Sequence, residues 1–253
     1  MKVLKFGGTS VANPENINKV KSILGNQEKN QIAVVVSAFG GVTDLLLNAS
    51  RSASKQDVGY ADSLKEIEDR HISAIRELIP VKSQSAALSK VKSELNILET
   101  LLEGAFLIGE LTPKLSDKIV SYGELLSSFI ISEFLKSEGL DASFKDSREL
   151  IKTDNNFGKA NVDFKMTNTL CQDFFDSNKN QITILPGFVA SSKSGDLTTL
   201  GRGGSDYTAA IIAAAVDAEI LEIWTDVSGM YTANPKLVKQ AKCVANISYQ
   251  EAM

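Results

Sequence analysis

Short apolar runs alternate along the chain with longer stretches whose apolar residues recur with a helical period. Val3 to Phe6 and Ile32 to Val36 have the length and composition of buried strands. Between them, Asn13 is suited to cap a helix because Pro14 can occupy its first position, and this helix should run to about Leu24. The alternation is typical of an α/β domain with a mostly parallel sheet.

The middle of the chain, from Ala61 to Leu135, is almost continuously helix-forming, with weak breaks near Pro80 and at Thr112-Pro113. Because it has no β-branched run of strand type, we expect about three or four helices there. Its charged residues should form solvated helix faces, with pairs such as Glu66 and Arg70.

A second section of strands and helices follows. It predicts a strand from Gln181 to Leu185, a hairpin from Phe188 to Leu200 that turns near Ser194-Gly195-Asp196, an apolar helix from Ser205 to Val216, and a strand from Glu219 to Trp224. No linker rich in Pro, Gly or Ser divides the chain, so residues 1–253 are interpreted as one domain. Near the end, Ser248 and Glu251 have the spacing of a capping box that opens a helix, and we expect the natural chain to continue beyond it.

Composition narrows the classes of function. A chain of 253 residues with 43% hydrophobic content can bury a sizeable core. The net charge is -4 and the Lys and Arg residues are scattered, which argues against a nucleic-acid partner. The few apolar residues before Gly7 are too short for a signal peptide or a membrane span, and we expect a cytoplasmic protein. Cys171 and Cys243 belong to no metal-ligand spacing, so no protein metal site is predicted.

Two glycine-rich segments, each next to a helix start, are candidates for anion binding. In Lys5-Phe6-Gly7-Gly8-Thr9-Ser10 the glycines let backbone N–H groups approach a phosphate, and Lys5 supplies a full charge. In Gly201-Arg202-Gly203-Gly204-Ser205-Asp206 a guanidinium is added that suits bidentate carboxylate or phosphate binding. Each segment taken alone could instead be a plain turn and a helix cap. Neither has the spacing of a P-loop or of a dinucleotide-binding loop.

A third polar cluster follows the last predicted strand, in Trp224-Thr225-Asp226-Val227-Ser228-Gly229-Met230-Tyr231. Ligands of doubly wound sheets bind outside the carboxyl ends of strands, and all three clusters occupy such positions.

Together the three clusters resemble the signatures of aspartokinases, in order and over essentially the whole chain. The first residues and the last six, Ser248 to Met253, are most similar to bifunctional aspartokinase/homoserine dehydrogenases. The resemblance implies the amino-acid kinase fold, an αβα sandwich around a mostly parallel sheet of about eight strands. It also implies that regulatory ACT domains and a dehydrogenase are absent from this sequence, and that the full-length protein is a homo-oligomer.

The resemblance further implies an activity, which is ATP-dependent phosphorylation of the side-chain carboxylate of L-aspartate to 4-phospho-L-aspartate, a first step toward lysine, threonine and methionine. The implied catalytic residues are Lys5 and Asp206. The implied substrate-binding residues are Ser37, Thr43, Glu124, Phe188, Arg202 and Ser205, with Arg202 on the α-carboxylate and Glu124 on the ammonium. The implied nucleotide-binding residues are Lys5, Gly7, Gly8, Ser10, Thr225, Asp226, Tyr231 and Lys236. The cofactors would be ATP and Mg²⁺, the ion bound mainly through the nucleotide phosphates.

This sequence departs from the family pattern in its last cluster. Ser228 stands where the family often has Asp, Asn234 replaces a frequent Asp, and Lys236 replaces a frequent Arg. Lys236 keeps a charge but lacks the bidentate fork of arginine, which weakens its expected phosphate role.

The chemistry needs no dedicated base, because an aspartate carboxylate with a pKa of about 3.9 is already ionised at neutral pH. His71 is therefore expected to be a surface or partly buried helix residue and not a catalyst. The central expectation is that Lys5 and the Arg202–Asp206 segment converge on one cavity. Two alternatives stay open, namely a kinase for glutamate or a related acid and a kinase-like domain that only binds ligands.

Overall fold

In the computed structural model, which describes residues 1–27, 30–235 and 237–252, five parallel strands form a central sheet. In spatial order they are β3 (Ala142–Phe144), β5 (Ile182–Pro186), β2 (Ile32–Val36), β1 (Lys2–Phe6) and β8 (Ile220–Trp224). The first strand of the chain thus lies inside the sheet, paired with β2 on one side and with β8 on the other.

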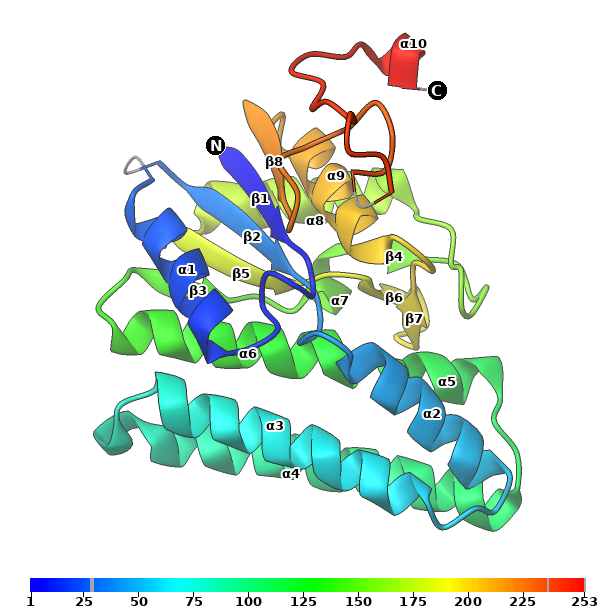
Figure 1. Ribbon diagram of the computed structural model, residues 1–253. Coiled ribbons are helices and arrows are strands. Elements are labelled where there is room, and N and C mark those ends of the chain that lie inside the picture. Colours follow the sequence, from blue (N-terminus) through cyan, green and yellow to red (C-terminus); the bar gives the residue numbers. More distant parts are fainter. Residues whose placement is uncertain (28–29, 236, 253) are drawn as a thin grey trace.

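One face of this sheet is covered by two helices, and a long helical hairpin packs beyond them (Figure 1). The helices of this half are α1 (Pro14–Gly25), α2 (Val42–Ser54), α3 (Tyr60–Leu78), α4 (Val81–Ile108), α5 (Pro113–Val120) and α6 (Tyr122–Ser137). The apolar residues of α1 and α6 and of the α3–α4 hairpin belong to one continuous buried cluster with the sheet.

The other face packs against a smaller cluster that contains α8 and α9. The elements here are α7 (Ser147–Leu150), α8 (Phe164–Ser177), α9 (Gly204–Ala215) and a second sheet of β4 (Lys152–Thr153), β6 (Val189–Ser192) and β7 (Leu197–Thr199). A short helix, α10 (Tyr249–Ala252), begins with the expected capping box, in which Ser248 Oγ accepts from the Glu251 amide and Glu251 Oε2 accepts from the Ser248 amide.

The alternation of side chains along β1 decides which face of the sheet Lys5 points to. Leu4 and Phe6 of β1 pack into the cluster beneath α1 and α6, whereas Val3 packs into the cluster of α9. Since side chains two residues apart share a face, Lys5 points to the same side as Val3. The one charged residue within this inner strand after Lys2 therefore faces α9.

The predicted fold class is confirmed, an α/β sandwich with a mostly parallel sheet. The strands are divided differently from the expected single sheet of about eight, because the described residues form five in one sheet and three in another. Helix α1 begins at its expected cap, where Asn13 accepts from the Asn16 amide. The hairpin of β6 and β7 also forms as predicted. The prediction missed α2, α7, α8, β3 and β4.

His71 lies in a helix as expected, but the expectation that it is a surface or partly buried residue is wrong. This side chain is fully buried, with 0% exposure, because its ring stacks on Phe39 at a centroid distance of 5.0 Å. Burial lowers its pKa to about 4 and keeps the imidazole neutral. The expected pair of Glu66 with Arg70 is also not formed in the described part of the chain, where the Arg70 guanidinium donates to backbone carbonyls instead.

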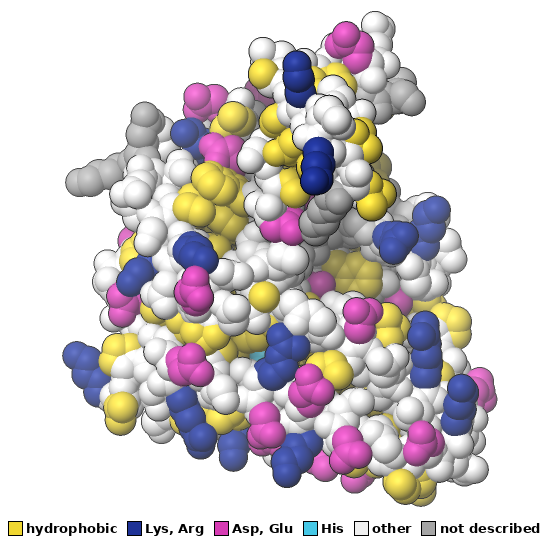
Figure 2. Space-filling view, viewed as in Figure 1, with side chains coloured by type: hydrophobic (Ala, Val, Ile, Leu, Met, Phe, Trp, Pro, Cys, Tyr) yellow, Lys and Arg dark blue, Asp and Glu magenta, His cyan; other side chains and the backbone are white. Residues whose placement is uncertain are grey.

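The surface carries no large region of one charge sign on the face drawn in Figure 2, where basic and acidic side chains are interspersed. Among residues 1–27, 30–235 and 237–252, no helix combines the length and the apolar character needed to cross a bilayer.

Candidate active site

A cavity of about 260 Å³ opens where the carboxyl ends of β1, β2 and β5 meet the start of α9. It is lined by Lys5, Ser37, Thr43, Glu124, Phe188, Gly201, Arg202, Gly203, Gly204, Ser205 and Asp206. Every residue that the sequence predicted for catalysis or for substrate binding is in this set. The convergence expected of Lys5 and the Arg202–Asp206 segment is therefore present in the structure.

An ion pair between Lys5 and Asp206 joins the two parts of the site. Lys5 Nζ lies 2.8 Å from Asp206 Oδ1, and the side chains are 11% and 53% exposed. Lys5 emerges near the end of β1, and Asp206 lies in the first turn of α9. Both side chains line the cavity, so an anion bound there can approach the Lys5 ammonium.

The glycine-rich loop before α9 has the backbone freedom that its sequence indicated. Gly201 and Gly203 have φ angles of 76° and 73°, in the left-handed region that glycine adopts without strain. Gly203 is the N-cap of α9 and has no side chain, so the backbone amides of the first turn receive no hydrogen bond from a capping side chain. Arg202 beside it is exposed and forms no ion pair within the described residues. The loop thus presents a guanidinium and a positive helix end to the same cavity.

Asp117 is a supporting residue that the sequence analysis missed. This α5 carboxylate is 3% exposed and accepts from the Gly158 amide at 2.9 Å, the Thr199 amide at 3.0 Å and the Thr199 hydroxyl at 2.8 Å. Burial raises its pKa, against the effect of these hydrogen bonds. Thr199 ends β7 just before the glycine-rich loop, so Asp117 fixes the point from which Arg202 extends. A lone Asp among the lysines of a short helix gives no sequence signal for this role.

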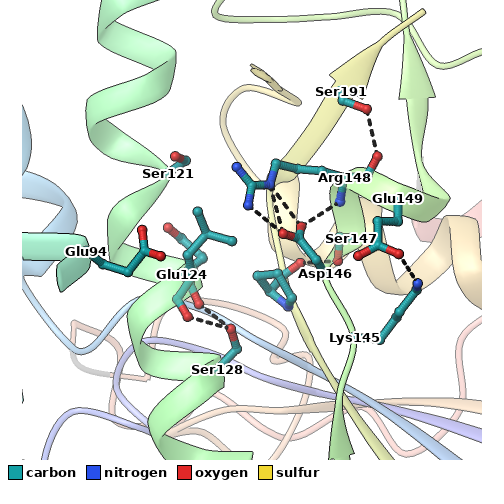
Figure 3. Close-up of polar contacts among 12 residues, drawn as sticks. Glu94, Ser121, Glu124, Ser128, Lys145, Asp146, Ser147, Arg148, Glu149 and Ser191 are labelled. Carbon is teal, nitrogen blue, oxygen red and sulfur yellow. Dashed lines mark hydrogen bonds and ion pairs between the residues drawn. The ribbon is translucent and has the colours of Figure 1, made fainter. Parts of the chain in front are cut away.

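Glu124 is a buried acid of the site, and its pKa is strongly raised. It lies in the first turn of α6, is 5% exposed, and its Oε2 has no hydrogen-bond partner among the described residues. Burial raises its pKa to about 8, even though the Ala38 amide donates to it. Figure 3 shows Glu124 with Ser128 one turn further along the helix, where the hydroxyl donates to the Glu124 carbonyl. An unpaired buried carboxyl oxygen at a cavity wall is suited to bind a cation.

The remaining wall residues are held by backbone contacts. Phe188 follows β5 with a φ of 67°, a strained conformation for a residue that is not glycine, and its amide donates to Thr208 Oγ1 at 2.9 Å. The Ser37 carbonyl accepts from Ser127 Oγ at 2.8 Å. Thr43 lies in the first turn of α2. Backbone strain such as that at Phe188 concentrates at ligand sites.

The residues predicted for the nucleotide are only partly brought together. Ser10, Thr225 and Asp226 line a second cavity of about 250 Å³ beside the ends of β1 and β8. Gly7 lies against the Lys5 ammonium, since a Cβ there would be 3.4 Å from Nζ, and Gly8 packs on the carbonyl of Ala38. Tyr231 forms an isolated bridge with Cys243 and lines neither cavity. The prediction for Lys236 falls outside the described residues.

At the strand ends of this parallel sheet, a lysine–aspartate pair, an arginine and a helix start lie together, an arrangement suited to small anionic ligands. The chain belongs to the amino acid kinase family, whose sequence model matches residues 1–253.

The relatives that it matches are longer than this chain. It is 34% identical over 251 residues to a bifunctional aspartokinase/homoserine dehydrogenase 2 of maize, covering 99% of this chain and 27% of the relative. It is 36% identical over 260 residues to lysine-sensitive aspartokinase 3 of Escherichia coli, covering 99% of this chain and 54% of the relative. A crystal structure of E. coli aspartokinase III with aspartate and ADP matches with a TM-score of 0.87 at 34% identity, over 96% of this chain and 53% of the other.

Proposed function

We propose that this chain transfers the γ-phosphoryl group of ATP to the side-chain carboxylate of L-aspartate, with 4-phospho-L-aspartate and ADP as products. The observation that carries the proposal is the shared cavity, in which Lys5, Asp206, Arg202 and Glu124 meet. The similarity to aspartokinases, one of them solved with aspartate and ADP, supports the choice of substrates.

Each charged side chain of the cavity has a separate task in this proposal. The exposed Arg202 fork binds the α-carboxylate of the amino acid, and the unpaired Oε2 of Glu124 accepts from its ammonium. These two contacts orient the side-chain carboxylate, which needs no deprotonation. Lys5 stabilises the charge that develops on the transferring phosphoryl group, and Asp206 holds the lysine in place at 2.8 Å.

Mg²⁺ fits the site as an ion carried by the nucleotide. The described residues hold no group of at least three His, Cys, Asp or Glu side chains that could bind a metal by themselves. Mg²⁺ commonly keeps several waters and bridges phosphates with one or two protein carboxylates, for which Asp206 and Asp226 are candidates. The ion would neutralise phosphate charge, while Gly7, Ser10, Thr225 and Asp226 would bind the nucleotide itself. The assignments of Tyr231 and Lys236 to the nucleotide stay predictions, as do the oligomer and the further domains.

The test of the amino acid is a hydroxamate assay that traps the acyl phosphate. With ATP and Mg²⁺, L-aspartate should give product, and L-glutamate and N-acetyl-L-aspartate should give far less, because the first is longer and the second lacks the ammonium. Equal rates with glutamate would contradict the choice of aspartate. No product with any acid would contradict the kinase activity and favour a domain that only binds ligands.

The test of the site is the variant Lys5→Ala, which should lower kcat at least ~100-fold because the charge on the phosphoryl group loses its main partner. Its fold should persist, since Asp206 is half-exposed and can be solvated. Lys2→Ala, at the opposite end of the same strand, is the matched control and should keep its activity. Unchanged turnover in Lys5→Ala, with the circular dichroism spectrum retained, would contradict the site.

A further inference from the structure

The loops that follow β1 and β2 pack backbone against backbone behind the cavity. The β1–α1 loop (residues 7–12) carries the glycines beside Lys5, and the β2–α2 loop (residues 37–41) carries Ser37. A Cβ at Gly40 would lie 2.9 Å from the Ala12 Cβ and 3.2 Å from the Gly8 carbonyl oxygen. With so little space between them, a shift of either loop must move the other.

One side chain from outside these loops holds both. Arg70 extends from α3, and its Nη2 donates to the Gly40 carbonyl at 2.6 Å and lies 3.5 Å from the Ala12 carbonyl. The guanidinium is partly buried and does not line the cavity. Since both acceptors are backbone oxygens at the ends of the two loops, Arg70 fixes the position of one loop relative to the other.

The neighbouring residue of α3 strengthens this attachment. His71 stacks on Phe39, the residue before Gly40, at a centroid distance of 5.0 Å. Its Nδ1 lies 2.6 Å from the Ile67 carbonyl, which places the ring proton on that nitrogen and fixes the ring plane. The β2–α2 loop is thus held by α3 at two consecutive residues. On its other side, Ala38 donates to Glu124.

We propose that Arg70 is a positioning residue that fixes the amino-acid side of the cavity relative to the phosphate side. This inference rests on the proposed function, because it assigns Ser37 and Glu124 to the amino acid and Gly7 and Lys5 to the phosphoryl group. In-line transfer requires the two ligands to meet in one geometry, and a displacement of about 1 Å can cost ~100-fold in rate. Arg70 touches neither ligand and acts through the two loops.

The test compares Arg70→Met with Arg76→Met, an exposed arginine further along the same helix. Arg70→Met should lower kcat by roughly 10- to 100-fold with little change in the KM for ATP, because alignment is lost while each subsite persists. Arg76→Met should match the wild type. Arg70→Lys keeps one donor for the Gly40 carbonyl and should recover part of the rate. It also serves as the second variant if Arg70→Met does not fold. A purely structural role would lower the melting temperature and leave kcat at low temperature unchanged, which would overturn the proposal.

A second measurement needs no activity and separates this inference from the kinase assignment. The amides of Ser10 and Val11 donate to Gly7 within the β1–α1 loop, and the amide of Val42 at the start of α2 donates to Phe39 of the β2–α2 loop, so all three report the order of these loops by hydrogen exchange. In Arg70→Met they should exchange at least ~10-fold faster in both loops, and in Arg76→Met at the wild-type rate. Unchanged exchange in both loops would overturn the positioning role. If the wild-type protein makes no product but Arg70→Met still exchanges faster in both loops, the proposed function is refuted and the coupling of the loops by Arg70 stands.

Discussion

The raised pKa of Glu124 predicts that aspartate binding depends strongly on pH. Binding of the substrate ammonium requires the ionised carboxylate, but burial holds the pKa of this acid at about 8 in the empty site. The ionised fraction is then about 1% at pH 6 and about 50% at pH 8. The apparent affinity should therefore rise about 50-fold over this range, and at pH 7 protonation costs about 1.4 kcal/mol of binding free energy.

Calorimetric titration of L-aspartate into the nucleotide-free protein measures this dependence directly. At pH 7 nearly one proton, about 0.9, should be released for each aspartate bound, which appears as a dependence of the binding enthalpy on the buffer. The only histidine does not interfere, because burial lowers the pKa of His71 to about 4.

Glu124→Gln is the control, and it should bind aspartate weakly with little change between about pH 6 and pH 8. The reasoning is refuted if the wild-type affinity is constant over this range, or if Glu124→Gln keeps the same slope.

Three further predictions concern the support of the site. Without substrate, the pKa of Glu124 is higher in the folded than in the unfolded protein, so the free energy of unfolding should fall as pH rises toward about 8. At that pH, a urea titration should show Glu124→Gln to be more stable than the wild type by ~1–3 kcal/mol. Asp117→Asn should lower the free energy of unfolding by ~1–3 kcal/mol, because three donors lose their carboxylate. It should also raise the KM for aspartate, because the loop that carries Arg202 loosens. An unchanged KM would refute this effect on the loop. Gly187→Ala should lower the free energy of unfolding by about 1–3 kcal/mol, since its Cβ would lie 2.6 Å from Ser205 Cβ. Gly104→Ala, whose added Cβ has nothing within 4 Å, should raise it by up to ~1 kcal/mol. Equal melting temperatures of the two variants would contradict this.

The sequence predicted the elements whose signals are local. Strand β2 is a continuous apolar run, and α1 has its Asn13 cap and Pro14 start. Helix α2 was missed because Gly41, in the left-handed region, begins it without a side-chain cap. Strand β3 has only three residues, too few for a periodic signal.

The candidate site was predicted in its residues but not in its environment. The glycine clusters indicated which loops are candidates for anion binding, yet no local pattern shows that β1 lies between β2 and β8. Glu124 and Asp117 look like surface acids, and only packing by distant elements makes them buried. The same holds for His71 of α3, whose ring is covered by Phe39 from the β2–α2 loop.

The interior place of β1 has a consequence for how the protein is made. Strand β1 leaves the ribosome well before its partner β8, which ends at Trp224, more than 200 residues later. Until then one edge of β1 stays open, and Asp206, the partner of Lys5, is synthesised only shortly before β8. Contacts this far apart along a chain form slowly. Nascent chains stalled before residue 220 should therefore depend on chaperones, and they should acquire protease resistance only after β8 has been synthesised.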